Sequence, residues 1–170
     1  MELTTREFWG LVHGLGLGGL FLVAFAGGLA GLYSLRPELV TEAGVAERMR
    51  RLIAGTTTMA AVAWATVITG TWVVYPWYRE DEPNSPRSAL LASEDTKDWH
   101  EFGMEWKEHI AWIAPMLATA VAVMVIYYRH DLIRNQTARR LATGLFVAAF
   151  ATAAIAGILG ALITKKAPIT

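Results

Sequence analysis

The sequence predicts an all-α integral membrane protein, a four-helix up-down bundle that forms a single domain over residues 1–170. Two observations carry this prediction. The chain is 54% apolar and only 18% charged, whereas soluble domains are about 25% charged. The charges avoid four stretches, each close to the length of about 20 apolar residues that a helix needs to cross a bilayer.

The predicted spans cover about residues 8–35, 52–75, 110–128 and 141–164. None of them contains Asp, Glu, Lys or Arg, whereas the helices of a soluble bundle would carry a polar stripe. The loop 76–109 begins with prolines that break the second helix. We expect an interfacial helix to begin near Lys97 and run into the third span, where Pro115 should kink the helix.

Arginines cluster beside the two short connections. The first group is Arg36, Arg48, Arg50 and Arg51, and the second is Arg129, Arg134, Arg139 and Arg140. The segment 80–108 instead holds nine acids and three bases. The positive-inside rule places the arginine loops in the cytoplasm. We therefore expect a multi-pass protein of the inner (cytoplasmic) membrane, with both termini and the acidic loop on the outer side.

The absence of cysteine narrows the chemistry. It excludes a thiol nucleophile, an iron–sulfur cluster held by thiolates and a covalently attached c-type haem. Any redox chemistry must therefore use a noncovalent cofactor.

Two histidines lie at similar depth in spans that run in the same direction. His13 precedes Arg36 by 23 residues, and His109 precedes Arg129 by 20 residues. The mismatch of three residues is about 4.5 Å along a helix, which ordinary tilt absorbs. Because a bundle can hold a haem between facing helices, the pair predicts one b-type haem, with His13 and His109 as its iron ligands.

Small and cationic residues at the same level support this prediction. Gly14, Gly70 and Gly157 would leave room for a macrocycle. Arg79 and Lys107 lie at the outer end, where cations would pair with the haem propionates. Gly27, Gly28 and Gly31, at the other end of the first span, are expected to serve close helix packing.

This constellation of His13, His109 and the glycines resembles the broad class of b-type cytochrome four-helix membrane subunits, which includes quinol-oxidoreductase anchor proteins. Two-haem members of that class carry four intramembrane ligands, so two histidines imply a single haem. The resemblance implies an electron-transfer subunit of an oxidoreductase complex rather than a stand-alone enzyme. Its redox partner would be quinol or a periplasmic protein.

Other hypotheses remain open. Glu101, Glu105 and His109 share one helix face and could bind a divalent metal, but the other spans offer no matching acids. A cofactor-free subunit that anchors or assembles a larger membrane complex is the alternative function, and a small transporter or sensor is a third. Expected partners are membrane lipid and a protein at the acidic outer loop, with quinone as a candidate and no nucleic acid. His100 falls on the opposite helix face from His109, and we expect it to face water.

Overall fold

The computed structural model describes residues 2–83 and 85–167, and this part of the chain contains helices and connections without a β-strand. Four helices are long and apolar enough to cross a membrane, as expected of a multi-pass membrane protein. These four rods cover Thr5–Ser34, Glu42–Tyr78, Trp99–Tyr128 and Gln136–Lys166. Each rod is longer than its predicted apolar span, because polar or aromatic turns continue the helix beyond the apolar residues.

Each of the first three rods contains a wide π-helical turn. Rod one consists of α1 (Thr5–Leu11), η1 (Val12–Gly16) and α2 (Leu17–Ser34). Rod two consists of α3 (Glu42–Thr69), η3 (Gly70–Val74) and α4 (Tyr75–Tyr78). Rod three consists of η4 (Trp99–Met104), α6 (Glu105–Ala111) and α7 (Ile113–Tyr128), and rod four is α9 (Gln136–Lys166). The connections hold η2 (Pro37–Leu39), α5 (Pro86–Leu91) and α8 (Asp131–Arg134).

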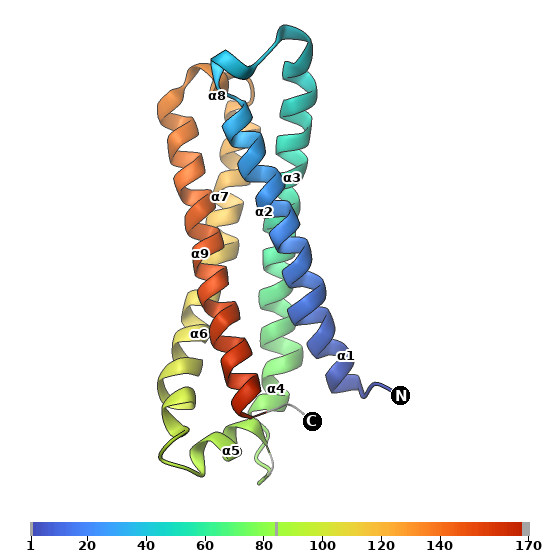
Figure 1. Cartoon of the computed structure of the whole chain (residues 1–170), viewed down its shortest axis with the longest axis vertical. Coiled ribbons are helices and arrows are strands. Elements are labelled where there is room, and N and C mark those ends of the chain that lie inside the picture. Colours follow the sequence, from blue (N-terminus) through green and yellow to red (C-terminus); the bar gives the residue numbers. More distant parts are fainter. Residues whose placement is uncertain (1, 84, 168–170) are drawn as a thin grey trace.

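The four rods lie side by side (Figure 1). α2 packs on α3, α3 on α7 and α7 on α9, whereas α2 and α9 meet along a shorter seam. The connections with η2 and α8 lie at one end of the molecule, which we call the arginine end. α1, α4, α5 and the last turns of α9 lie at the opposite end, which we call the acidic end (Figure 1).

Side-chain caps explain where several helices begin. The Thr4 hydroxyl accepts from the Glu7 backbone N–H, and the Glu7 carboxylate accepts from the Thr4 N–H. Asn135 Oδ1 accepts from the Ala138 N–H at 2.9 Å and starts rod four. Such caps satisfy backbone donors that have no partner within the helix.

The kink expected at Pro115 takes the form of a break between α6 and α7. Trp112 separates the two helices, three residues before the proline. Pro115 has no N–H to donate to the Ala111 carbonyl, so the helical ladder is interrupted there. α6 is therefore a seven-residue segment with η4 before it and a break after it.

Two apolar cores fill the interior. The larger core extends from the arginine end and includes Phe146, which is fully buried. A Cβ atom on Gly28 would lie 2.5 Å from Phe146 Cζ, and one on Gly31 would lie 3.0 Å from Leu52 Cδ1. Gly28 and Gly31 therefore serve close packing, as predicted, whereas Gly27 does not, since nothing lies within 4 Å of a Cβ added there. A smaller core at the acidic end contains Tyr78, Leu90, Met104, Ile163 and Ala167.

We expect Gly28→Ala to destabilise the protein by about 1–3 kcal/mol, because the added methyl group overlaps a ring that has no room to move. Phe146 is stacked on Phe25 with ring centroids 5.4 Å apart. Gly27→Ala is the matched control, since nothing lies within 4 Å of its added Cβ. Thermal unfolding in detergent measures both variants, and equal stability of the two would contradict the packing argument.

Candidate functional site

The two apolar cores are separated by a polar layer around His13, which lies in η1. His13 Nδ1 lies 3.0 Å from Thr69 Oγ1. The Thr69 hydroxyl donates its own hydrogen to the Ala65 carbonyl at 2.8 Å, so its oxygen acts as the acceptor and His13 Nδ1–H as the donor. This tautomer leaves a lone pair on His13 Nε2.

Gly70 provides the space in which the imidazole lies. A Cβ atom at Gly70 would lie 2.9 Å from His13 Cε1 and 3.5 Å from Nε2. Gly70 is also the first residue of η3, so two wide turns on neighbouring rods meet at this contact. π-helical turns inside α-helices are frequent at functional sites. Gly70 thus accommodates the histidine itself, whereas the sequence had suggested that it accommodates a macrocycle.

Rod three contributes Lys107 to this layer. Its side chain lies along Gly160 of α9, where an added Cβ would be 3.0 Å from Lys107 Cε. Lys107 is half-buried and interacts electrostatically with His13 and with Glu108. No carboxylate of the described residues forms an ion pair with it. Lys107 therefore adds a positive charge beside His13.

His109 does not join this layer. Its side chain is exposed on α6, and Nδ1–H donates to the Glu105 carbonyl at 2.7 Å. Within residues 2–83 and 85–167, no hydrogen bond or ring contact links it to His13. The structure therefore places His13 in the polar layer and His109 on the exposed face of α6.

The other residues expected around a haem are also dispersed. Gly14 and Gly157 are exposed, and nothing lies within 4 Å of an added Cβ at either position. Arg79 is exposed, donates to the Tyr75 hydroxyl at 2.6 Å and lies over the Tyr75 ring. Gly70 packs against the His13 ring, Lys107 interacts with it electrostatically, and Gly14 follows it directly in the chain.

The structure places His100, not His109, in the protein interior. His100 Nδ1 lies 2.8 Å from the Tyr78 hydroxyl, and both side chains are buried. Leu90 and Met104 belong to the same small apolar core as Tyr78. The expectation that His100 faces water is wrong, because rod three turns this residue towards the end of rod two. The aromatic residues at Tyr75–Tyr78 are unusual for the end of a span, but the sequence does not indicate that Tyr78 would contact His100.

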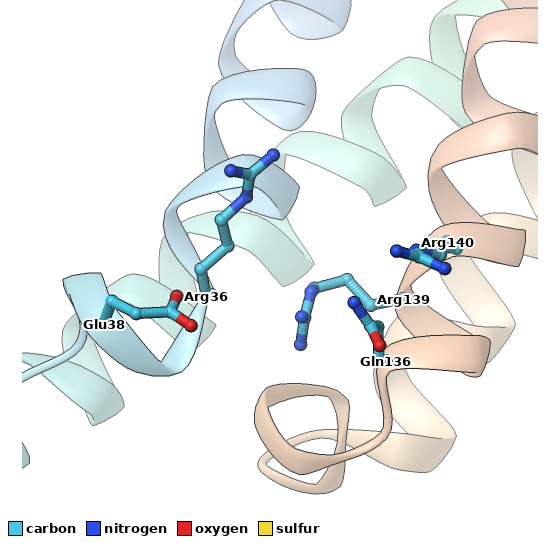
Figure 2. Close-up of a pocket in the computed structure, with 5 residues that line it drawn as sticks. All are labelled: Arg36, Glu38, Gln136, Arg139 and Arg140. Carbon is cyan, nitrogen blue, oxygen red and sulfur yellow. The ribbon is translucent and has the colours of Figure 1, made fainter.

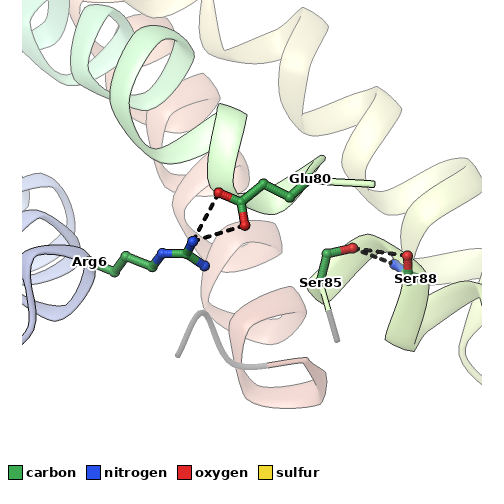
Figure 3. A network of polar contacts seen from close by, with 4 residues as sticks. All are labelled: Arg6, Glu80, Ser85 and Ser88. Atoms are coloured by element: carbon green, nitrogen blue, oxygen red, sulfur yellow. Dashed lines mark hydrogen bonds and ion pairs between the residues drawn. The ribbon is translucent and has the colours of Figure 1, made fainter. Parts of the chain in front are cut away.

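Ion pairs and a helix cap hold the connection between rods two and three. Arg6 Nη2 lies 2.9 Å from both oxygens of Glu80, which ties α1 to the residues after α4 (Figure 3). Ser85 Oγ donates to Ser88 Oγ at 3.0 Å and accepts from the Ser88 backbone N–H at 3.2 Å (Figure 3). This contact caps α5. The acidic connection is therefore a folded cap on the bundle.

The exposed charge of this cap is strongly negative. Seven of the nine acids between residues 80 and 108 are exposed: Asp81, Glu82, Glu94, Asp95, Asp98, Glu101 and Glu105. The three bases are at most half-exposed. Arg87 pairs with Asp81, Lys97 pairs with Glu94, and Lys107 lies along Gly160. We call these seven exposed acids the acidic surface.

The metal hypothesis gains no support from the geometry. Glu101, Glu105 and His109 are all exposed, as expected for one helix face. Among the residues that the structure describes, no group of three or more His, Asp or Glu side chains is arranged to hold a metal ion. The stripe therefore belongs to the surface of the cap.

We expect Tyr78→Phe to destabilise the cap by about 1–3 kcal/mol, because it leaves buried His100 Nδ1 without its partner. Hydrogen exchange of residues 85–104 should accelerate, while exchange in α7 and α9 should not change. Tyr127→Phe is the control, since Tyr127 is 79% exposed. If both variants exchange alike, the Tyr78–His100 contact does not hold the cap.

Comparisons of the chain with protein-family models, curated protein sequences and solved structures found no match.

Proposed function

We propose that the chain is a multi-pass subunit that anchors a larger membrane complex, and that a basic partner protein docks on its acidic surface. The chain crosses the membrane as an up-down bundle. The acidic end faces outward with both termini, because clustered arginines beside short connections favour the cytoplasmic side. The membrane is the inner (cytoplasmic) membrane.

The separation of exposed acids from engaged bases carries this proposal. Seven acids face solvent, and only two of them, Asp81 and Glu94, pair with a base of the cap. The third base of the cap, Lys107, lies along Gly160. A surface of one sign steers a partner of opposite sign and sets its orientation. The cap is also held in place by Tyr78–His100 and Arg6–Glu80. A partner would therefore meet a preorganised surface.

Exposed aromatic residues lie next to these acids. Phe102 and Trp106 are 63% and 54% exposed, with ring centroids 5.6 Å apart. They alternate with Glu101 and Glu105 along η4 and α6. Aromatic residues are enriched at the core of protein interfaces, and charged residues are more common at the rim. Phe102 and Trp106 would provide apolar contact area within the electrostatically guided complex.

The experiment places a photo-crosslinking side chain at position 102 in living cells, with position 123 in the middle of α7 as a lipid-facing control. We expect one discrete protein adduct at position 102 and none at position 123. The double substitution Glu101→Lys/Glu105→Lys should lower the affinity of the purified pair on the order of tenfold, by reversing two charges. High salt should also weaken the pair.

Glu38→Lys/Glu42→Lys changes the net charge equally at the arginine end and should leave the adduct unchanged. The proposal fails if no adduct forms at position 102, or if the two double substitutions reduce it equally.

The His13–Thr69 contact favours a second function, electron transfer by a single b-type haem. Thr69 fixes the imidazole through Nδ1 and leaves Nε2 with a lone pair that could bind haem iron. The residues fit this group only in part, because His109 is exposed on α6. His109 would have to turn inward by rotation of α6 between η4 and the break at Trp112. When bound, the haem would supply one-electron transfer with quinol or the docked protein.

The visible spectrum of protein expressed with excess haem tests this second function. A haem-binding chain should show a Soret band and a reduced alpha band, both abolished by His13→Ala and by His109→Ala. His130→Ala is the control, because His130 is exposed at the arginine end. A colourless protein excludes the haem function and leaves the docking proposal intact.

A further inference from the structure

We propose that an anionic phospholipid binds at the arginine end, along the seam between α2 and α9. Its phosphate would lie among three arginines, and one acyl chain would follow an apolar groove between the two helices. This inference depends on the membrane-spanning rods but not on the docking or haem proposals.

The polar part of the site is a pocket of about 330 Å³. Arg36 reaches it from the end of α2, while Gln136, Arg139 and Arg140 come from the first turns of α9 (Figure 2). Glu38 is the carboxylate that lines it. Three guanidinium groups against one carboxylate leave an excess of positive charge, and arginine binds phosphate through charge-assisted hydrogen bonds.

The three arginines are not neutralised within the described part of the chain. No ion pair joins any of them to Glu38 or to another described carboxylate. Arg139 is held by donating to the Leu132 and Ile133 carbonyls at 2.7 and 2.9 Å. Arg36 lies over the Tyr33 ring, 4.0 Å from its centroid. These contacts position the guanidinium groups without cancelling their charge.

An apolar groove of about 680 Å³ continues from this pocket. It shares Arg36 and Arg139 with the polar pocket. Its apolar lining comes mainly from α2: Phe25, Ala26, Leu29, Ala30, Leu32 and Tyr33. The rise from Phe25 to Arg36 is about 16 Å at 1.5 Å per residue. This matches one leaflet of a hydrocarbon core about 30 Å thick.

Charge and shape together favour a phospholipid as the occupant. A soluble anion would fill the polar pocket but leave the groove empty, and a zwitterionic lipid would not offset the excess arginine charge. Basic pockets between transmembrane helices are typical sites for anionic lipid headgroups. Because the cations lie where the apolar groove ends, a single amphipathic molecule satisfies both.

The experiment uses native mass spectrometry of the delipidated full chain. It compares phosphatidylglycerol, phosphatidylcholine with the same acyl chains, and chain-free glycerophosphoglycerol. We expect one phosphatidylglycerol to bind more tightly than either other compound. Arg36→Gln/Arg140→Gln should weaken the binding of phosphatidylglycerol about thirtyfold, since each arginine near an anionic lipid contributes about 1 kcal/mol to the binding free energy. Phosphatidylcholine binding should hardly change.

Matched controls separate this site from general charge and bulk. Arg50→Gln/Arg51→Gln removes two exposed arginines of α3, which pair with Glu47, and should leave lipid binding unchanged. Ala30→Trp fills the groove and should weaken phosphatidylglycerol, whereas Ala54→Trp on an exposed face of α3 should not.

Several outcomes overturn the proposal. One is equal affinity for phosphatidylglycerol and phosphatidylcholine. Another is an equal loss of phosphatidylglycerol affinity in the two arginine double variants. The third is that glycerophosphoglycerol binds as tightly as phosphatidylglycerol. If Ala30→Trp changes the oligomeric state and leaves lipid affinity unchanged, the groove is an interface with a second copy instead.

Discussion

The structure depends on one constraint, which is that polar atoms inside apolar rods must find partners within the chain. Threonine hydroxyls meet it by donating to the carbonyl four residues earlier, at Thr56, Thr66, Thr69, Thr119, Thr143 and Thr152. Once its hydrogen is committed, each hydroxyl oxygen can still accept. Thr119 accepts from Trp64 Nε1 at 3.0 Å, and Thr69 accepts from His13. The same rule therefore links neighbouring rods and selects the tautomer of His13.

This rule explains why the interior is divided. The larger core packs without polar side chains at the close approach of Gly28 to Phe146. Towards the acidic end, His13 and Lys107 interrupt apolar packing, and the smaller core beyond them surrounds the Tyr78–His100 contact. The polar layer thus separates the larger core from the smaller one, and α9, which contributes Phe146 to the first and Ile163 to the second, passes through all three.

The sequence predicted the elements that depend on composition and failed where the rotation of a helix matters. The four apolar stretches, the interruption before Pro115 and the packing role of Gly28 followed from residue type alone. The inward or outward direction of His109 depends on η4 and on the break at Trp112. A single added residue rotates the following face by about 100°. The number of residues between His109 and Arg129 predicts how deep the histidine lies. The π-helical turns, however, do not change the pattern of apolar residues, so the sequence does not reveal them. For the same reason, the sequence did not predict that His13 contacts Thr69 or that His100 contacts Tyr78.

Charge at the two ends follows from the same need for partners. Arg6–Glu80, Arg87–Asp81 and Lys97–Glu94 pair three bases of the acidic end, and five of the seven acids of the acidic surface form no ion pair in the described chain. The arginine end has the opposite imbalance, because Arg36, Arg139 and Arg140 make no ion pair in the described chain. Neither excess is offset within one copy of the protein. The basic protein and the anionic lipid that we propose would each offset one of these excesses, and the zero net charge of the chain is the sum of the two opposed imbalances.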